Sequence, residues 1–413
     1  MRLLAGKAAE NRIRELANRV SQLGTIEPQV RKIVSDVRRH GDRALLKYAR
    51  KWDGLEPRQA VRVPAAEIRK AWKSSSPQFR SALEQAAANV RRFCEWQKPT
   101  EWMRKSNGTV LGQLVRPLES VGCYVPGGRY PLPSTLLMTV VPAQVAGVSV
   151  IRVVSPKPRL ETLAAAGMLG VTEFYRVGGA HAIAALAYGT ESLPRVDKIV
   201  GPGNLYVTAA KKLVAFDCAI DFLAGPTEVV IVAESGEAEF IAADLVAQAE
   251  HDPEALAVFI TSSRPLAEKV AACADDLARG NPVARQSLAS KGVALVAVSH
   301  QQALEWANLL APEHITVARR DAAAVRNAGS VFIGDYSPQA VGDYASGPNH
   351  VLPTAGAARY RGGLSVLDFV KIITIQELSP AALRRISPVV TTLAEAEGLQ
   401  AHADSVRVRC AHA

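Results

Sequence analysis

The stretch VSVIRVVSPKPRLETLAAAGMLGVTEFYRVGG, residues 148–179, decides the fold class of this chain. The β-branched run Val148–Val154 predicts a buried strand, and the alanine-rich Leu160–Leu169 after it predicts a helix. Glu173–Val177 predicts the next strand, ahead of a Gly-Gly pair that opens a further helix. A strand, a helix and a strand at this spacing are typical of a βαβ unit in a parallel sheet.

Strands and helices keep alternating along the rest of the chain. The first series continues with a helix at Ala180–Tyr188, a strand at Lys198–Val200 and a helix at Leu205–Val214. The second series has strands at Val229–Val232, Ala257–Thr261, Val293–Val298, His314–Val317 and Val331–Gly334, with helices at Ala238–His251, Pro265–Leu277, Gln301–Leu310 and Ala322–Asn327 between them. We therefore expect an α/β fold with two doubly wound Rossmann-like domains, each built on a parallel sheet.

Both ends of the chain are predicted to be helical. Within residues 1–110, apolar side chains recur at helical spacing, as in the segment 30–37. The tail from about Leu367 is predicted to be helical again, at Ala381–Arg385 and Val390–Leu399. We expect these ends to extend from the two α/β domains.

Composition limits the class of protein. The chain has 413 residues, 48% of them hydrophobic and 21% charged, which is typical of a globular protein with more than one domain. No apolar run approaches the roughly 20 residues that cross a bilayer, and the first residues lack the apolar region of a secretory signal. The five scattered cysteines form no CxxC motif, so we expect a cytoplasmic protein with free thiols and no membrane partner.

The net charge of +10 raises the question of nucleic-acid binding. The basic residues are spread along the chain in pairs such as Arg38-Arg39 and Lys211-Lys212. Aromatic residues make up only 6% of the chain and do not alternate with the basic ones, as base stacking would require. We expect no nucleic-acid partner, although a basic surface can attract an anionic cofactor.

Four of the eight histidines lie in short polar islands within apolar sequence, at residues 248–251, 313–314, 343–350 and 402. Gln248 and His251 are three residues apart on a predicted helix, so their side chains share one face and suit two ligands of one cation. A capping histidine beside a surface glutamine is the other interpretation of this pair.

The segment Asp343–His350 is predicted to be a tight loop, because it holds glycine and proline between its polar ends. An Asx-turn with a buried histidine would explain it equally well. Taken with Gln248 and His251, however, Asp343 and His350 complete a mixed nitrogen and oxygen set that suits zinc or a similar ion.

Glu313-His314 stands at a predicted helix-to-strand junction and is the best acid/base candidate. Histidine titrates near neutrality, and an adjacent carboxylate can orient it or activate a water. A histidine favoured by the dipole of a helix end is the structural alternative.

The same domain has three glycine-rich turns, Val125–Gly128, Gly178-Gly179 and Gly201–Asn204, and the last two follow predicted strands. Turns of this kind can place phosphate groups on backbone N–H donors at the start of a helix. None is a GxGxxG motif, and no acidic residue for a ribose follows at the expected spacing, so ordinary βα turns remain the alternative.

The chain resembles histidinol dehydrogenases over residues 20–405, through a series of short blocks in one order. These blocks are YVPGG (124–128), VGGAHAIAALAYGT (177–190), VDKIVGPGN (196–204), AGPTE (224–228), QAEHD (248–252), APEH (311–314), GDYASGPNHVLPT (342–354), GLSVLDF (363–369) and EGLQAHA (397–403). The resemblance implies a zinc-containing homodimer that oxidises L-histidinol to L-histidine with two NAD, the last step of histidine biosynthesis.

The resemblance also implies roles for individual residues. The zinc ligands would be Gln248, His251, Asp343 and His402, and Glu313 with His314 would be the acid/base pair. The substrate would contact the four zinc ligands and His314, and also Thr227, His350 and Glu397. NAD would lie against Tyr124, His181 and Asn204. Because the helical tail reaches the partner in this family, Glu397 and His402 would complete the neighbour's site.

The expected division of the chain follows from the same resemblance. Residues 1–20 would be a helical extension, and residues 21–121 with 228–366 would form the Rossmann-like domain that holds zinc and the catalytic pair. Residues 122–227 would form the NAD-binding domain. Residues 367–413 would form a helical tail that contacts the partner subunit.

Two positions depart from the usual family pattern. His181 stands where most members have Gln, and Thr227 stands where most have Ser. Gly128-Arg-Tyr-Pro-Leu is in addition similar to a branch of the family that acts on other small polyols, including sulfonated diols. Glu397 favours a substrate with an amino group, because a carboxylate pairs with an ammonium. A zinc hydrolase and a non-catalytic zinc protein are the alternatives outside dehydrogenases.

Overall fold

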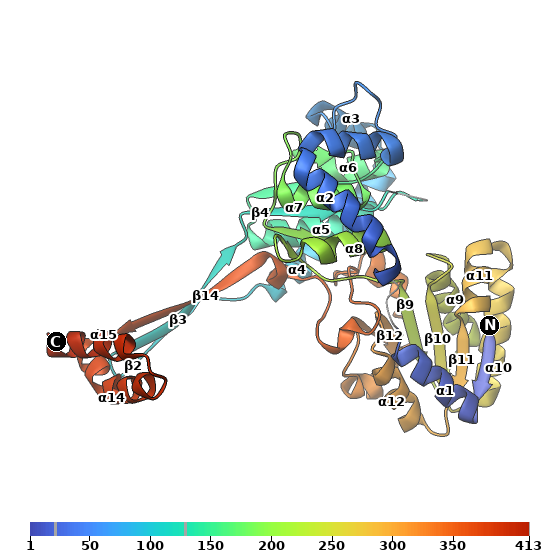
Figure 1. Cartoon of the computed structure of the whole chain (residues 1–413). Coiled ribbons are helices and arrows are strands. Elements are labelled where there is room, and N and C mark those ends of the chain that lie inside the picture. The colour runs from blue at the N-terminus through green and yellow to red at the C-terminus, as the bar shows by residue number, and fades with distance from the viewer. Residues whose placement is uncertain (20–22, 128–129, 413) are drawn as a thin grey trace.

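The computed structural model describes residues 1–19, 23–127 and 130–412. It is a mixed α/β structure with two parallel sheets in the body and a small antiparallel sheet in an arm (Figure 1). The arm extends away from the body and carries the C-terminal helices at its far end. Within the described ranges, no helix has the length and apolar character to cross a membrane.

The first parallel sheet has five strands in the order β6-β5-β4-β7-β8. Its strands are β4 (Ser120–Tyr124), β5 (Val150–Val154), β6 (Glu173–Tyr175), β7 (Lys198–Val200) and β8 (Ala219–Ile220). Helices α3 (Ala65–Ser74), α4 (Pro77–Gln97), α5 (Pro133–Ala146) and α6 (Leu160–Met168) cover one face. Helices α2 (Leu23–Tyr48), α7 (Gly179–Tyr188) and α8 (Leu205–Val214) cover the other.

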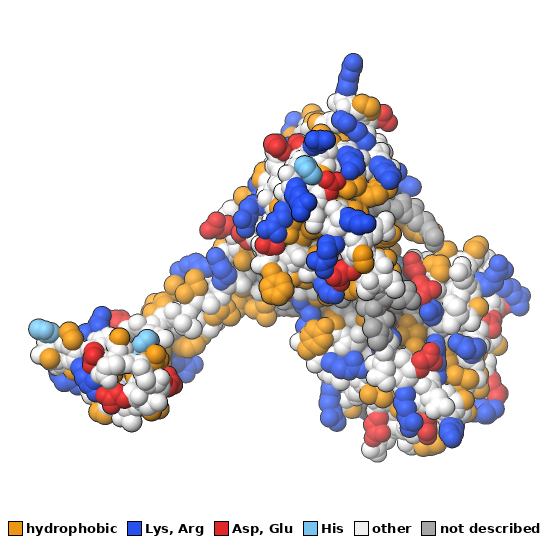
Figure 2. Space-filling model, viewed as in Figure 1, with side chains coloured by type: hydrophobic (Ala, Val, Ile, Leu, Met, Phe, Trp, Pro, Cys, Tyr) orange, Lys and Arg blue, Asp and Glu red, His pale blue; other side chains and the backbone are white. Residues whose placement is uncertain are grey.

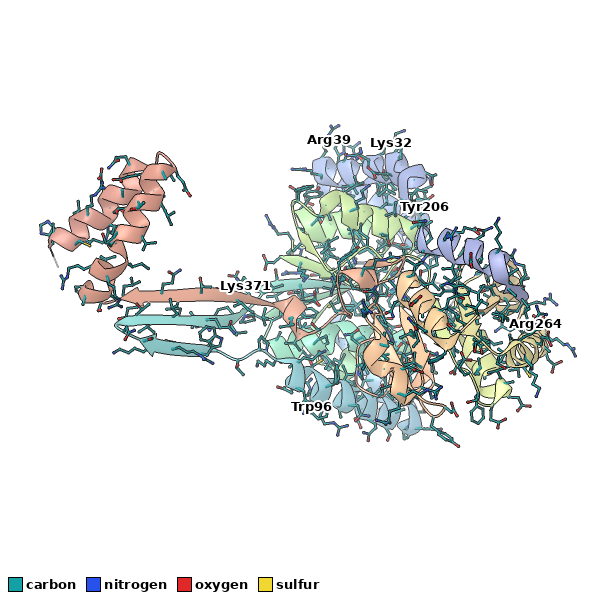
Figure 3. The ribbon with its side chains drawn as sticks, turned by 90° about the horizontal axis from the view of Figure 1, so that it is seen from below. Lys32, Arg39, Trp96, Tyr206, Arg264 and Lys371 are labelled. Atoms are coloured by element: carbon teal, nitrogen blue, oxygen red, sulfur yellow. The ribbon has the colours of Figure 1, made fainter. Side chains whose placement is uncertain are left out.

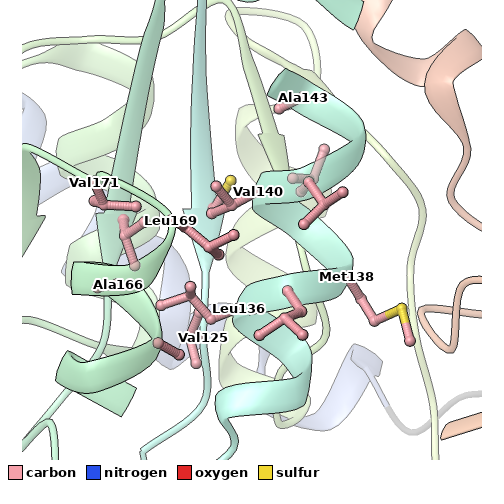
Figure 4. Close-up of a cluster of buried hydrophobic side chains, with 14 of the residues drawn as sticks. Val125, Leu136, Met138, Val140, Ala143, Ala166, Leu169 and Val171 are labelled. Atoms are coloured by element: carbon pink, nitrogen blue, oxygen red, sulfur yellow. The ribbon is translucent and has the colours of Figure 1, made fainter. Parts of the chain in front are cut away.

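The core beneath α5 explains why this helix forms where it does. Leu136, Met138 and Val140 are fully buried and belong to one core cluster with Val125, the residue after β4, although Met138 points away from Val125 (Figure 4). α5 is apolar on nearly all sides, which is the pattern of a helix enclosed between a sheet and other helices. Burying this face removes several large side chains from water, at roughly 1.5–3 kcal/mol each.

The second parallel sheet has six strands in the order β1-β11-β10-β9-β12-β13. Its strands are β1 (Arg2–Ala5), β9 (Glu228–Val232), β10 (Leu256–Thr261), β11 (Val293–Val296), β12 (His314–Val317) and β13 (Ser330–Ile333). Helices α1 (Gly6–Ala17) and α12 (His300–Leu310) cover one face, and α9 (Ala238–Ala249), α10 (Arg264–Leu277) and α11 (Pro282–Ser290) cover the other. The central strands β9 and β10 consist almost entirely of apolar residues, because both of their faces are buried.

The two parallel sheets share one strand order. In both, counted along the chain and leaving β1 aside, the strands lie as third, second, first, fourth and fifth. The direction of winding therefore reverses between β4 and β7 in one sheet, and between β9 and β12 in the other. Ligands of such sheets commonly bind at this reversal point, beyond the carboxyl ends of the strands.

The arm contains the antiparallel strands β2 (Trp102–Ser106), β3 (Thr109–Pro117) and β14 (Val370–Leu378), followed by α14 (Pro380–Ala396) and α15 (Gln400–Ala411). Figure 3 places Lys371 on β14 along the stem of the arm. Figure 2 shows hydrophobic side chains along this stem. The short helices elsewhere are η1 (Ala49–Asp53), η2 (Ala278–Gly280), η3 (Arg319–Ala324), α13 (Gln339–Tyr344), η4 (Ala357–Arg359) and η5 (Val366–Phe369).

The alternating strands and helices expected between residues 148 and 334 are present, but both ends of the chain differ from the prediction. Arg2–Ala5 is a strand, because it adds to the edge of the six-stranded sheet beside β11. The segment 102–117 forms β2 and β3, and the tail holds the nine-residue strand β14. Long-range pairing with strands far along the chain outweighs local helical spacing at these places.

The division of the first 121 residues also differs from the prediction. Residues 1–17 belong to the six-stranded sheet through β1 and α1 and are not an extension of it. The helices from 23 to 97 were expected beside the zinc and catalytic residues, but they pack on the five-stranded sheet. The apolar face of α2 explains this, since Val30, Val34 and Val37 are buried against α7 and α8.

Candidate active site and cofactor crevice

The predicted acid/base pair lies at the amino edge of the six-stranded sheet. β9 and β12 are neighbouring parallel strands, and His314 at the start of β12 is in register with Val229. Thr227 and Glu228 therefore lie beside Glu313 and His314 at the ends where the two strands begin. Strand pairing brings together segments that are more than 80 residues apart in the chain.

Glu313 is a buried carboxyl group, 7% exposed, with two hydrogen-bond donors on one oxygen. Its Oε2 accepts hydrogen bonds from Thr227 Oγ1 at 2.5 Å and from the Glu228 backbone N–H at 2.9 Å. Burial raises the pKa of Glu313 to about 7, although His314 and the two donors oppose that shift. A carboxyl group that titrates near neutrality can both take and return a proton.

His314 lies between two carboxylates and is 3% exposed. Its Nδ1 is 3.8 Å from Glu313 Oε2, and its Nε2 is 3.5 Å from Asp343 Oδ1. Burial alone would lower the pKa of His314, but the charges of Glu313 and Asp343 outweigh burial and raise it. Nδ1 has no hydrogen-bond partner among the described residues. The ring thus lies between Asp343 on its Nε2 side and Glu313 on its Nδ1 side.

Other predicted site residues surround this pair. Gln248 is 3% exposed on the last turn of α9, and its Nε2 donates to Thr227 Oγ1. Asp343 lies on α13, and its backbone carbonyl accepts a hydrogen bond from His350 Nδ1 at 2.6 Å. Burial would raise the pKa of Asp343, but His314, followed by the charges of His350 and His251, lowers it, so His251 belongs to the same cluster.

His350 connects the cluster to the five-stranded half of the body. Its Nε2 lies 3.4 Å from Thr135 Oγ1 on α5, while Nδ1 donates to the Asp343 carbonyl on α13. Asn349 beside it donates to the Met138 carbonyl on α5 at 2.6 Å. The predicted loop therefore starts only after α13, at residue 345, and the segment 345–354 lies against both halves, so that a substrate held near His350 would lie close to each of them.

The donors of this cluster suit zinc, but the described part of one chain holds too few of them. Gln248, His251 and Asp343 offer an amide, an imidazole and a carboxylate, which are donor types that zinc accepts. Among the described residues, no group of three or more His, Cys, Asp or Glu side chains could hold a metal ion. The expected fourth ligand, His402, is exposed on α15 at the far end of the arm (Figure 1).

The structure does not bring His402 and Glu397 to the other site residues. Glu397 is the C-cap of α14 and His402 lies in the first turn of α15, so both belong to the arm. Both are exposed. The remaining predicted residues at positions 227, 248, 251, 313, 314, 343 and 350 gather in the body, at the amino edge of the six-stranded sheet.

A separate cavity of about 550 Å³ lies at the carboxyl edge of the five-stranded sheet. The residues expected to contact the cofactor, Tyr124, His181 and Asn204, all line it. They come from the ends of β4, β6 and β7, which converge because the strands are parallel. Gly128 of the first glycine-rich turn lies outside the described residues.

Hydrogen bonds to neighbouring residues fix the side chains that line this cavity. Tyr124 Oη accepts a hydrogen bond from the Gly179 N–H, and burial raises the pKa of Tyr124 to about 12. Asn204 caps α8 by accepting from the Val207 N–H. His181 Nε2 lies 2.7 Å from Asp53 Oδ2, and its buried Nδ1 has no hydrogen-bond partner in the described part of the chain. An unpaired polar atom beside a cavity fits a polar ligand.

Glycine is required at one turn of this edge. Gly201 has φ of +112°, and a Cβ there would lie 2.2 Å from the Tyr124 carbonyl oxygen. The close approach of the β7 turn to β4 therefore depends on the absence of a side chain. This is the turn that opens α8 at Asn204.

Trp52 and Asp53, which no sequence motif indicated, also line the cavity. Both come from η1, which follows α2. Asp53 accepts hydrogen bonds from the Gly178 N–H and pairs with His181, and Trp52 lies with its ring centroid 5.8 Å from that of His181. No local motif could have identified these residues, because α2 was assigned to the other half of the body.

Comparisons with known proteins point to the same family as the short sequence blocks. The family model described as histidinol dehydrogenase matches residues 16–410. A histidinol dehydrogenase of Methanothermobacter thermautotrophicus is 45% identical over 96% of this chain and 97% of its own length. One of Thermus thermophilus is 47% identical over 93% of this chain and 95% of its own length.

A solved structure supports the same assignment. The histidinol dehydrogenase of Elizabethkingia anophelis has a TM-score of 0.92 and 34% identity, and the match covers 99% of this chain and 98% of that one. An acetylating aldehyde dehydrogenase from Geobacillus thermoglucosidasius has a TM-score of 0.50 at 12% identity, which is a likeness of fold alone. The resemblance deduced from the short blocks is confirmed, and the chain belongs to the histidinol dehydrogenase family.

Proposed function

We propose that this protein oxidises L-histidinol to L-histidine with two molecules of NAD, through L-histidinal that stays bound, as the last step of histidine biosynthesis. The observation that carries this proposal is the buried Glu313–His314 pair, joined to Gln248 through Thr227 and to Asp343 through the imidazole. Membership of the histidinol dehydrogenase family supports the reaction class.

In the first oxidation, His314 takes the proton of the substrate hydroxyl while the carbon-bound hydrogen leaves as hydride. Asp343 fixes the ring and favours the imidazolium that forms. NAD, bound in the crevice at the carboxyl edge of the five-stranded sheet, would accept the hydride. The aldehyde that results is shielded from solvent by the buried surroundings of Glu313 and His314.

In the second oxidation, a water adds to the bound aldehyde, and Glu313 takes a proton from that water. A second hydride then leaves the hydrated carbon and the carboxylic acid forms, so one water and two NAD are consumed. A pKa of about 7 suits Glu313 to this role, since a useful fraction is ionised at neutral pH. Thr227 orients the carboxyl group through its hydroxyl.

Zinc, held by Gln248, His251 and Asp343 with His402 of a second copy, would hold the imidazole and amino nitrogens of the substrate as a template. The substrate would also contact Thr227, His314 and His350, with Glu397 on its ammonium group. The five-stranded half would bind NAD at Tyr124, His181 and Asn204. The six-stranded half would hold zinc and the acid/base pair.

We further propose a homodimer in which the arm of each copy reaches the other copy's site. The arm exposes apolar side chains that a monomer would leave in water, including Ile372 at 52%, Val389 at 58% and Leu393 at 59% exposure. Glu397 and His402 lie on the same arm, distant from the other site residues of their own chain.

Mixing two inactive variants tests the shared site directly. His314→Ala and His402→Ala should each be inactive alone, and hybrids should regain activity because one of their two sites has both residues intact. The control is each variant mixed with itself. Recovery of no activity in verified hybrids would contradict the shared site.

Product analysis tests the reaction itself. We expect two NADH per histidine formed from histidinol, with no free aldehyde. Turnover of a small diol, such as a sulfonated one, without turnover of histidinol would assign the chain to a related dehydrogenase. Failure to bind NAD in calorimetry would favour a zinc hydrolase instead.

A further inference from the structure

The glycine-rich turn Gly178-Gly179 opens α7 at the cavity, but its backbone donors are already in use. The Gly178 N–H donates to Asp53 Oδ2 at 2.9 Å, and the Gly179 N–H donates to Tyr124 Oη at 3.1 Å. A phosphate bound at this turn would have to displace both acceptors. The turn is therefore held by Asp53 and Tyr124, and what it contributes to the cavity is the position of His181, which follows it on α7.

His181 is enclosed on one side by residues of α2 and η1. Its Nε2 lies 2.7 Å from Asp53 Oδ2, and the residue is 1% exposed. The rings of Trp52 and Tyr48 have their centroids 5.8 and 5.9 Å from that of His181. Asp53 is itself 7% exposed, so the contact between the two polar side chains is shielded from water. A hydrogen bond in such surroundings is strengthened and holds the ring in one orientation.

Asp53 decides which ring nitrogen of His181 carries the proton. Its Oδ2 already accepts the Gly178 N–H, and a carboxylate has no proton of its own to donate. The contact with His181 therefore requires the proton on Nε2, and the neutral ring then offers a lone pair at Nδ1. Nδ1 is buried and has no hydrogen-bond partner among the residues that the structure describes.

Nδ1 lies on the side of the ring that faces Gly179. A Cβ built at Gly179 would be 3.4 Å from Nδ1, and Gly179 and His181 both line the cavity. Glycine has no side chain to cover this nitrogen, and the φ of +57° at Gly179 favours glycine. A buried acceptor without a partner is costly, so a donor from a ligand in the cavity would stabilise the ring. A dinucleotide carries such donors in its amide, amino and hydroxyl groups.

We infer that Asp53 is a positioning residue for the dinucleotide, because it fixes His181 with Nε2–H toward itself and leaves Nδ1 as the acceptor for an N–H or O–H group of NAD. The inference rests on the proposed binding of NAD in this cavity and deepens it by naming the residue that orients the binding group. Asp53 acts through His181, since its Oδ2 is occupied by that ring and by the Gly178 N–H.

Nitrogen-15 NMR of the full-length protein, labelled at its histidines, tests the tautomer before any ligand is added. The signals of His181 are those that disappear in His181→Gln. We expect the proton on Nε2 and none on Nδ1, and the Nδ1 signal should shift when NAD is added. A ring that carries a proton on Nδ1, with or without one on Nε2, would overturn the inference.

Calorimetric titration with NAD tests Asp53 through a double-mutant cycle. Asp53→Ala should raise the dissociation constant about tenfold, roughly the effect of one hydrogen bond, while kcat at saturating NAD stays within about threefold. His181→Leu should raise it by a similar factor, and adding Asp53→Ala to that variant should have less than about a threefold further effect. Fully additive effects would mean that Asp53 acts through Gly178 alone, and would overturn the inference.

Conservative variants keep the test valid if Asp53→Ala does not fold. Asp53→Asn retains a side-chain oxygen that can accept both N–H groups, so NAD should bind within about threefold of the wild-type protein. His181→Gln should also bind within about threefold, because its amide offers an N–H to Asp53 and a carbonyl oxygen to the ligand. Loss of NAD binding in both conservative variants would contradict the assigned donor and acceptor roles.

The matched control is Asp321→Ala on the other parallel sheet. Asp321 is 6% exposed and its Oδ1 lies 2.8 Å from His300 Nε2, so this variant loses an equivalent contact outside the cavity. It should leave the dissociation constant for NAD within about twofold. No binding of NAD by the wild-type protein would contradict the proposed function and the inference together. Binding of NAD that does not depend on Asp53 would contradict the inference alone.

Discussion

The two parallel sheets have the same strand order, yet their candidate sites lie at opposite edges. The five-stranded sheet has its cavity at the carboxyl ends of β4, β5 and β7, where strand order predicts a ligand. The six-stranded sheet places Glu313 and His314 at its amino edge. Strand order therefore predicts the location of the crevice but not that of the acid/base pair.

At the carboxyl edge of the six-stranded sheet, a histidine lies between two carboxylates. There the His300 ring is hydrogen-bonded on both sides, by Nε2 to Asp321 at 2.8 Å and by Nδ1 to Glu234 at 3.2 Å. These carboxylates raise the pKa of His300, despite the burial that opposes them. His300 thus joins the loop after β9 to η3, while the buried Asp321 Oδ2 has no hydrogen-bond partner among the described residues.

Removing His314 should have the largest effect on activity, and the effect should be limited to the six-stranded sheet. We expect His314→Ala to lower kcat by about 10³-fold, since a positioned base contributes roughly 10²–10⁴. Binding of NAD at the other sheet should be unchanged, and zinc content should be retained. Steady-state kinetics, calorimetry and metal analysis check the three parts. A fully active variant would mean that another group takes the proton.

The amino edge also depends on a buried ion pair. Arg19 donates to both oxygens of Glu228 at 2.7 Å, and the Glu228 side chain is 4% exposed. Arg19→Ala leaves that carboxylate unpaired and should reduce the free energy of unfolding by about 3 kcal/mol, measured by urea denaturation.

Arg152→Ala is the matched control for that substitution on the other sheet. Its partner Glu173 is more exposed, at 22%, so the loss should be only about 1 kcal/mol. Equal losses for the two variants would mean that burial does not distinguish the two pairs.

Gly201→Ala is directed at the carboxyl edge of the five-stranded sheet. The added methyl group would meet the Tyr124 carbonyl at a backbone angle that favours glycine, with a strain of about 2 kcal/mol. We expect NAD to bind about 30-fold more weakly, while zinc content is unchanged. Gly280→Ala, where a Cβ meets nothing within 4 Å, is the control.

Close to neutrality, the smallest expected effect is that of pH on the second oxidation. Because burial raises the pKa of Glu313 to about 7, the group is protonated below that pH and cannot take a proton from water. The rate of histidinal oxidation should therefore fall about tenfold per pH unit below 7 and level off above it. Glu313→Gln should be slow and lack this slope. A rate that is flat from pH 5 to 8 would exclude Glu313 as the base.

Much of the fold was predictable because its signals are local. β5 and α6 follow directly from VIRVV and the alanine-rich run after it, and both lie within a residue or two of the expected bounds. β1 and β14 were missed for a physical reason. Arg2–Ala5 is a strand only because β11 pairs with it, and Val370–Leu378 only because β3 does.

The site was predictable in part. Glu313, His314, Gln248 and Asp343 do gather, as the polar islands indicated. Asp53 could not be found, since its position beside His181 depends on how α2 packs. Glu397 and His402 stay a prediction, because their place in a site requires a second copy of the chain.

Strand β1 has a consequence for synthesis of the chain. Its partner β11 begins at Val293, whereas β1 begins at Arg2, so 291 residues (293 − 2) separate their first paired positions. At the usual 5–20 residues per second, β1 leaves the ribosome about 15–60 s before β11 does. During that time the backbone donors and acceptors of β1 have no β11 to pair with. A chaperone that binds short extended segments could therefore bind β1 in this interval.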